Sequence, residues 1–242
     1  MSLSSTPSET GFALRSVHLQ RGRTQVFSGL NLQLHEQRIG LIGDNGAGKT
    51  SLLRMLCGLE TPDSGEVLCQ GQALQYAGSQ RPRWVGMMFQ NPDDQIIFPT
   101  VEEELALGLQ GQGMAKKQAK AQAVAFLAQR GLQHWADRAI ASLSQGQRQH
   151  VCWLALLLAN PRSLLLDEPY ASLDLPGQAR LAQDIHQTPQ QVIVSTHLLD
   201  HVRAFPRVIW LQSGQVCADG PGHTVCAAYE ADVRQRIACT NA

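Results

Sequence analysis

The stretch GDNGAGKT, Gly43 to Thr50, decides the fold of this 242-residue chain. Its order of a glycine, four residues, a glycine, a lysine and a threonine is the phosphate-loop pattern. The apolar run RIGLI precedes it, as a strand should, and TSLLRMLCGL continues from it with the spacing of a helix. Because strand, loop and helix come in the order that phosphate binding requires, we expect a nucleotide site rather than a structural glycine turn.

Each part of this loop has an expected role in holding ATP. The backbone N–H groups from Asn45 to Lys49 are expected to cradle the β- and γ-phosphates, the Lys49 ammonium to add positive charge, and the Thr50 hydroxyl to ligate Mg²⁺. The nucleotide-binding residues predicted from the loop are Asp44, Asn45, Gly46, Ala47, Gly48, Lys49, Thr50 and Ser51.

The composition excludes several other classes of protein. Twenty basic and twenty acidic residues cancel, so no overall positive field would recruit nucleic acid or anionic lipid. The apolar runs WLALLLA and SLLLD are shorter than the roughly 18 to 20 residues that cross a bilayer. Residues 1–10 lack the regions of a signal peptide and are expected to be a disordered lead. We therefore expect a globular protein of the cytosol that has no nucleic-acid partner and reaches a membrane only through another protein.

The strand and helix patterns predict a single α/β domain over residues 1–242. Short apolar strands alternate with helical segments over residues 11–90 and 160–242, which indicates a parallel sheet covered on both faces. Residues 91–159 have a helical texture, rich in Ala, Gln and Lys, and are expected to form an inserted helical subdomain. The tail from His223 to Ala242 carries no signal that predicts its role.

A second chemical motif is SLLLDEP, Ser163 to Pro169, in which a buried strand ends in two carboxylates. Asp167 is expected at the carboxyl edge of the sheet, where it would reach Mg²⁺ through water. Glu168 is expected to orient or deprotonate the water that attacks the γ-phosphate. The alternative is that both residues begin a helix, as a cap and an acidic first turn.

Two further strands end in polar residues that fit the same chemistry. MMFQ ends in Gln90, whose amide can touch Mg²⁺ or the attacking water, and VIVSTH ends in His197. A neutral imidazole can bond the γ-phosphate and hold the base in place. We predict Glu168, His197 and Gln90 as catalytic residues, and Thr50, Gln90 and Asp167 as metal ligands. Taken singly, Gln90 and His197 would be ordinary exposed loop residues.

The polar turn ASLSQGQRQH, Ala141 to His150, precedes a long apolar helix and predicts a second anion site. Ser144 is a natural N-cap, and Gly146 lets a phosphate approach the backbone at the positive end of the helix. One nucleotide needs only one phosphate loop. We therefore expect this site to serve the nucleotide of another subunit across a two-fold axis. The alternative is an ordinarily capped buried helix.

Six motifs occur in a fixed order, namely GDNGAGKT, FQ at Phe89 and Gln90, LSQGQ, LLLDEP, ASLD at Ala171 to Asp174, and STH at Ser195 to His197. Together they resemble the ATP-binding cassette (ABC) ATPases over nearly the whole chain. The resemblance implies an α/β fold: a P-loop NTPase of the ABC type with a RecA-like parallel-sheet core, an antiparallel β subdomain and an inserted helical subdomain. It implies that the partner's nucleotide is bound by Ser144, Gln145, Gly146 and Gln147. It also places Asp174 in a loop that crosses the dimer interface.

The segment FQNPDDQIIFPTVEEELALGL, Phe89 to Leu109, is similar to the ATPases of energy-coupling-factor (ECF) importers. This narrower resemblance implies an ATPase that acts at the cytoplasmic face of the inner membrane, as a homodimer or paired with a related ATPase. Its other partners would be an integral coupling (T) component and a substrate-binding membrane subunit, for cobalt, nickel, biotin or another vitamin. Asp93, Asp94 and Glu102 to Glu104 are expected to receive arginines of the coupling component. The alternative is a capping box of Thr100 and Glu103.

The sequence departs from the family pattern in three places. Gln145 replaces the commonest glycine of the LSQGQ motif, and His150 stands where an arginine is usual. The region that should supply an aromatic residue to stack on adenine is LQRGR. We therefore predict that the planar guanidinium of Arg21 is the adenine platform. The alternatives for function are the ATPase subunit of a conventional ABC transporter and a soluble ABC protein that acts on nucleic acid or ribosomes.

Overall fold

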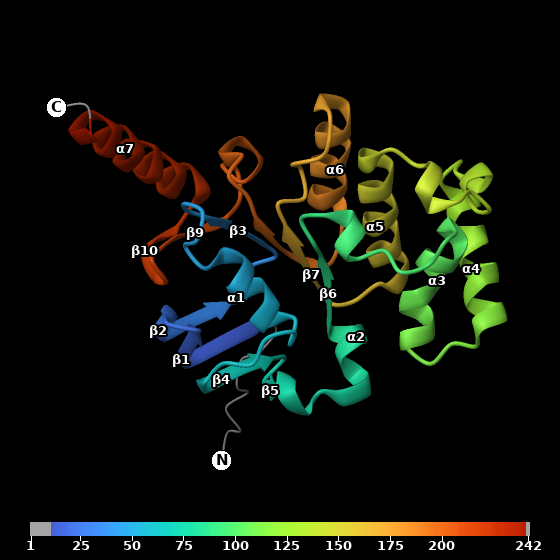
Figure 1. The fold of residues 1–242 in the computed structure, drawn as a ribbon, viewed down its shortest axis with the longest axis horizontal. Coiled ribbons are helices and arrows are strands. Elements are labelled where there is room, and N and C mark those ends of the chain that lie inside the picture. Colours follow the sequence, from blue (N-terminus) through green and yellow to red (C-terminus); the bar gives the residue numbers. More distant parts are fainter. Residues whose placement is uncertain (1–10, 241–242) are drawn as a thin grey trace, which may run out of the picture. The chain divides into compact units, whose positions relative to one another are not determined.

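The computed structural model describes residues 11–240, so the predicted lead at residues 1–10 lies outside the described residues. The chain divides into two compact units (Figure 1). The first unit contains the described residues up to Ala77 and those from Gln191 onward, and the second runs from Gly78 to Gln190. The predicted subdomain boundaries near residues 90 and 160 stay a prediction. No helix within residues 11–240 is long and apolar enough to cross a membrane.

The first unit begins with a four-stranded antiparallel sheet in the order β2-β1-β4-β5. Leu30, Leu32 and Leu34 alternate with exposed residues along β2 and are all buried, because alternate side chains of a strand point to the same face. The strands are β1 (Phe12–Arg21), β2 (Thr24–Leu34), β4 (Ser64–Cys69) and β5 (Gln72–Ala73).

The other strands of the first unit place the phosphate loop. Strand β3 (Arg38–Ile42) pairs in parallel with β8 (Gln191–Ser195) and with β9 (Arg207–Gln212), and β10 (Gln215–Gly220) pairs antiparallel with β9. All five residues of β3 are buried, as expected for a strand covered on both faces. The Thr196 N–H donates to the Leu41 carbonyl at 3.1 Å, so the loop after β3 and the residues after β8 leave the sheet at the same edge.

Two helices complete the first unit. Helix α1 (Lys49–Leu56) follows the phosphate loop, which confirms the predicted order of strand, loop and helix. Helix α7 (Gly222–Thr240) forms the tail, a segment whose role no sequence pattern predicts. It packs against β9 and β10 (Figure 1). Val225 and Cys226 of this helix are buried.

The second unit combines a parallel strand pair with a helical layer. Strand β6 (Val85–Met88) pairs in parallel with β7 (Ser163–Asp167), and Val85 lies opposite Ser163. The apolar core of the layer lies among α3, α4 and α5, where Gly108 lets α3 approach α5: a Cβ at Gly108 would lie 2.7 Å from the Ala159 Cβ. The helices are α2 (Arg81–Trp84), α3 (Val101–Gly111), α4 (Lys116–Gln129), α5 (Gln145–Ala159) and α6 (Leu175–Gln187).

The reversal of the chain after β3 requires a glycine. Gly43 has a φ of +138°, and a Cβ at this position would lie 2.0 Å from the Leu211 carbonyl oxygen of β9. We predict that Gly43→Ala lowers the free energy of unfolding by about 2 to 4 kcal/mol, through backbone strain and overpacking. Chemical denaturation measures this change.

Gly46→Ala is the matched control for this prediction. Gly46 also has a positive φ, +80°, but no atom lies within 4 Å of the place that a Cβ would take. Its expected cost is about 1 kcal/mol, from the left-handed backbone alone. Equal losses in the two variants would mean that the close approach of β9 does not constrain the turn.

Candidate functional site

The phosphate loop is held from inside by its own lysine. The Lys49 Nζ donates to the carbonyl oxygens of Gly43 at 2.7 Å and of Asp44 at 3.1 Å, and only 8% of Lys49 is exposed. The Ala47 N–H closes the turn by donating to the Asp44 carbonyl at 3.2 Å. The ammonium therefore lies within the loop, where it adds positive potential to a site for anions.

The loop leaves room for a phosphate and points a helix end at it. Gly46 is exposed, and the space where a side chain would project from it is open. Helix α1 begins after Gly48, and no side chain caps this described helix start, so its first N–H groups and the positive end of its dipole suit an anion. Both observations fit the triphosphate of ATP.

The residues predicted to act with this loop lie in two units. His197 is exposed and follows β8 in the first unit, and Thr50 is exposed in the first turn of α1. Gln90 is exposed after β6 in the second unit, where Asp167 and Glu168 lie at and after the end of β7. Their catalytic and metal-binding roles stay predictions. The oxygen donors of Thr50, Gln90 and Asp167 are of the kind that Mg²⁺ prefers.

The carboxylates at the end of β7 lead into a turn and do not begin a helix. Asp167 and Glu168 are 3% and 9% exposed, and Glu168 has a φ of +47°. The Ala171 N–H donates to the Glu168 carbonyl at 3.2 Å. The next helix is α6, whose N-cap is Asp174. The alternative interpretation of these carboxylates as a helix start is therefore wrong. A non-glycine residue held in the left-handed region is a feature found at functional sites.

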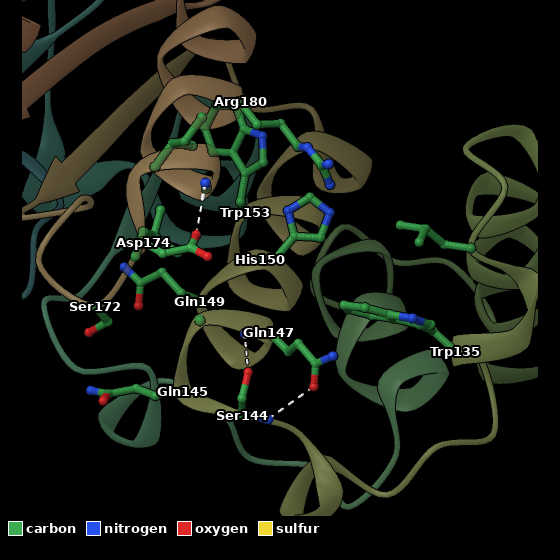
Figure 2. Close-up of a pocket in the computed structure, with 15 residues that line it drawn as sticks. Trp135, Ser144, Gln145, Gln147, Gln149, His150, Trp153, Ser172, Asp174 and Arg180 are labelled. Carbon is green, nitrogen blue, oxygen red and sulfur yellow. Dashed lines mark hydrogen bonds between the residues drawn. The ribbon is translucent and has the colours of Figure 1, made fainter.

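The polar turn of the second unit caps helix α5 (Figure 2). The Gln147 N–H donates to the Ser144 Oγ at 3.3 Å, and the Ser144 N–H donates to the Gln147 Oε1 at 3.0 Å. This confirms Ser144 as the N-cap and adds a capping box that was not predicted. Because the Ser144 Oγ accepts in the cap, its hydrogen remains able to donate to an anion.

A cavity of about 610 Å³ lies beside this cap and is lined by the beginnings of both α5 and α6. Gln145, Gly146 and Asp174 line it together with aromatic residues (Figure 2). The Asp174 Oδ1 accepts from the Gly177 N–H at 2.9 Å, so Asp174 caps α6. The structure thus brings five predicted residues to one surface, namely Ser144, Gln145, Gly146, Gln147 and Asp174.

His150, which departs from the family pattern, packs as an aromatic residue. Its ring lies edge-on to Trp135 with the ring centroids 5.9 Å apart (Figure 2). Burial lowers the pKa of His150 below its ordinary value, so the imidazole is neutral at pH 7. A cation on this part of α5 is Arg148, whose Nε lies 3.0 Å from the Asp93 Oδ1.

Arg21, the predicted adenine platform, forms an ion pair with Glu60. Its Nε donates to the Glu60 Oε1 at 2.6 Å and its Nη2 donates to the Oε2, an arrangement that fixes the plane of the guanidinium. The hydrogen bond to Glu60 raises the pKa of Arg21. Of the Arg21 side chain, 47% is exposed, so a nucleotide can reach it, and its contact with adenine stays a prediction.

The acidic residues after Gln90 do not all face outward. Glu104 is only 4% exposed, and its Oε2 accepts from the N–H groups of Ile97 and Phe98 at 2.9 Å each. The prediction that Glu104 receives a partner arginine is therefore wrong, because backbone donors of its own chain take the carboxylate. Lys120 of α4 binds both Glu102 at 2.8 Å and Glu103 at 3.2 Å, so these two carboxylates hold a cation of their own chain, and their contact with a partner's arginine stays a prediction.

The alternative capping box at α3 is also wrong. The Thr100 hydroxyl donates to the Glu103 carboxylate at 3.0 Å, and the Thr100 side chain does not cap the backbone of the described helix start. Asp93 and Asp94 are exposed. Asp93 is paired with Arg148, and the contact of Asp93 or Asp94 with a partner's arginine stays a prediction.

Two residues that contact the phosphate loop were not predicted. Tyr229 and Arg236 of α7 both bind the Asp44 side chain. Their spacing on the helix gives no signal that links them to a loop 185 and 192 residues away in the sequence.

The chain is similar to a known protein family and to individual members of it. A family model described as "ABC transporter" matches residues 27–171. The biotin transport ATP-binding protein BioM of Rhodobacter capsulatus is 43% identical over 88% of this chain and 91% of its own length. An energy-coupling factor transporter ATP-binding protein of Methanoculleus marisnigri is 35% identical over 84% of this chain and 76% of its own.

A solved structure supports the same fold. The structure of cbiO1 from Clostridium perfringens, described as part of the ABC transporter complex cbiONQ, superposes with a TM-score of 0.76 at 24% identity. The match covers 93% of each chain. It confirms the predicted fold class.

Arg21→Ala tests the adenine platform. We predict a loss of ATP affinity of about two- to fivefold, because an exposed cation–π contact contributes about 0.5 to 1 kcal/mol. Titration with a fluorescent ATP analogue measures it. Arg15→Ala is the control, since Arg15 lies on the same strand with its own carboxylate, Glu66, at 3.8 Å. Unchanged ATP affinity in Arg21→Ala would show that Arg21 is not the adenine platform.

The Gly146→Ala variant tests anion binding at the start of α5 without an expected loss of stability. A Cβ at Gly146 would make ordinary contacts at 3.5 Å to the Ser172 oxygen and 3.6 Å to the Leu173 Cδ2, so the stability should not fall. Because the methyl group would occupy the approach of a phosphate, we predict ATP-dependent dimerisation weakened about tenfold or more. Light scattering with ATP and chemical denaturation measure the two properties. Unaltered dimerisation would show that no phosphate meets the backbone there.

Proposed function

Because this chain belongs to the ABC transporter family of ATP-binding proteins, we propose that it is the ATP-hydrolysing subunit of an ECF-type importer for a micronutrient. The similarity to a biotin transport ATP-binding protein, 43% identical over 88% of this chain, carries this proposal and makes biotin the first substrate to test. Cobalt, nickel or another vitamin are the other candidates from the ECF resemblance.

In this proposal the phosphate loop binds ATP, and Glu168 in the turn after β7 activates the water that attacks the γ-phosphate. Lys49 and the N–H groups at the start of α1 bind the phosphates, Glu168 accepts a proton from the attacking water, and His197 bonds the γ-phosphate. Gln90 orients the same water. Mg²⁺, held by Thr50 and Asp167 with Gln90, would neutralise charge on the phosphates when bound. Glu168 is 9% exposed, which protects its proton transfer from bulk solvent.

The proposal also uses two copies of the site. The capped start of α5, with Ser144 and Gly146, presents N–H groups and a hydroxyl to a second anion. This second anion would be the nucleotide of the other subunit, so that ATP binding closes the dimer and hydrolysis opens it. A homodimer and a heterodimer with a related ATPase both satisfy this requirement.

The contact with the membrane component would lie on the segment after Gln90. Asp94 is exposed and Ile97 is 73% exposed, which together offer charge and apolar surface to a partner. Asp93 joins this segment to α5 through Arg148. An arginine of the coupling component that competes for Asp93 would therefore act on the same helix that carries Ser144. Through this contact the chain would sit at the cytoplasmic face of the inner membrane.

The Glu168→Gln variant tests this function. We predict that it keeps ATP binding, accumulates a dimer and loses turnover by about 10²- to 10⁴-fold, because a general base contributes about that factor. The variant, trapped with ATP and Mg²⁺ in solubilised native membranes, should bring down an integral coupling protein and a small membrane-embedded binding subunit. Mass spectrometry identifies both.

The control is the Lys49→Ala variant under the same conditions, which should show no ATP-dependent capture. Recovery of a conventional permease pair would move the function to another class of ABC transporter. Ribosomal or DNA-bound partners would overturn the membrane role. Near-normal hydrolysis by Glu168→Gln would show that another group is the base.

A further inference from the structure

Helix α7 is anchored to the sheet that carries the phosphate loop. The Tyr229 ring packs against Trp210 of β9 with the ring centroids 5.4 Å apart, and only 9% of Trp210 is exposed. Glu230, the next residue of the helix, binds Arg203. These contacts lie within the first unit, so they fix α7 relative to β9, which pairs with β3.

From this position α7 binds the side chain of Asp44, the second residue of the GDNGAGKT loop. The Tyr229 hydroxyl donates to the Asp44 Oδ1 at 2.8 Å. The Arg236 guanidinium donates to both oxygens, to Oδ2 at 2.7 Å and to Oδ1 at 3.3 Å. The Arg236 Nε also donates to Asp232, one turn earlier, at 2.7 Å, which orients the guanidinium toward the loop.

A carboxylate in this loop opposes what the loop has to do. ATP brings negative phosphates, and an Asp44 side chain without its partners would repel them. It would also attract the Lys49 ammonium, whose charge already helps to lower the pKa of Asp44. The larger causes of this lowered pKa are the hydrogen bonds from Arg236 and Tyr229. Helix α7 therefore supplies the Asp44 carboxylate with a cation, Arg236, and with a hydrogen-bond donor, Tyr229.

We propose that Arg236 and Tyr229 are positioning residues for nucleotide binding, which hold the Asp44 carboxylate aside so that Lys49 serves the phosphates. The inference rests on the proposed role of this loop as the nucleotide site. It gives the C-terminal helix a role in ATP affinity, although neither residue needs to touch ATP. The side chains of Arg236 and Asp44 are 43% and 41% exposed, so the effect should be moderate and should weaken with salt.

A double-mutant cycle between Asp44 and Arg236 tests the inference. In the full chain, Arg236→Ala should raise the Kd for Mg·ATP about threefold, the size expected for an exposed charge pair. The kcat at saturating ATP should stay within about twofold of wild type, because Arg236 acts on binding. In the Asp44→Asn background, which has no carboxylate to hold, replacing Arg236 should not change the Kd further.

Three other variants separate positioning from a structural role. Arg234→Ala is the matched control, because Arg234 lies on the same helix and pairs with Glu230 at 3.8 Å. Arg236→Lys should recover part of the affinity, since it restores the charge without the bidentate geometry. Tyr229→Phe keeps the ring against Trp210 and removes only the donor, so a smaller rise in Kd is expected. Thermal unfolding of each variant reports its folded fraction.

The outcomes are distinct. Equal effects of Arg236→Ala in the wild-type and Asp44→Asn backgrounds, or a Kd that matches the Arg234→Ala control, would overturn the inference and leave the proposed function standing. If Arg236→Ala does not fold, an unchanged Kd in both Arg236→Lys and Tyr229→Phe overturns it in the same way. Failure of the wild-type chain to bind ATP would overturn the proposed function, and the inference with it.

Discussion

The reversal of the backbone at Gly43 is the constraint on which the nucleotide-binding unit depends. Strand β3 ends against β9, where the Leu211 carbonyl leaves no space for a Cβ, so the chain turns into the loop with a backbone that only glycine adopts without strain. The Lys49 ammonium then fills the turn and bonds its carbonyl groups. The loop is thus shaped by backbone sterics and one buried cation, and its N–H groups are placed by the same two features.

Sequence patterns predicted those parts of the molecule that are determined by interactions between residues close together in the chain. The order of β3, loop and α1, the Ser144 cap and the buried strand that ends at Asp167 each depend on residues close together in the sequence. The role of Glu104 was misjudged because its partners are backbone donors that precede its own helix. The contact of Glu102 and Glu103 with Lys120 had no local signal either, since Lys120 comes from another helix. The contact of α7 with Asp44 had no local signal, since it joins the two chain segments that form the first unit.

The departures from the family pattern are explained in part by how α5 packs. A neutral His150 fits against Trp135 where a charged arginine would be costly to bury. The positive charge on the helix is instead supplied by Arg148, which reaches Asp93 in the segment after Gln90. Helix α5 also packs through apolar core residues such as Val151 and Leu154, and Arg148 adds an ionic contact to these. The Arg148 N–H donates to the Ser144 carbonyl at 2.9 Å, so a displacement of Asp93 would act on a residue that is bonded to the cap.

The contacts of Arg236 and Tyr229 with Asp44 couple the docking of α7 to the affinity for ATP. If holding the carboxylate aside favours ATP by some factor, then bound ATP favours the docked helix by the same factor, because linkage is reciprocal. At an exposed ion pair that factor is modest, about threefold for each site. A dimer with two independent sites would combine them to about ninefold. A protein that draws α7 away from β9 and β10 would then lower the fraction of closed, ATP-bound dimer without entering either nucleotide site.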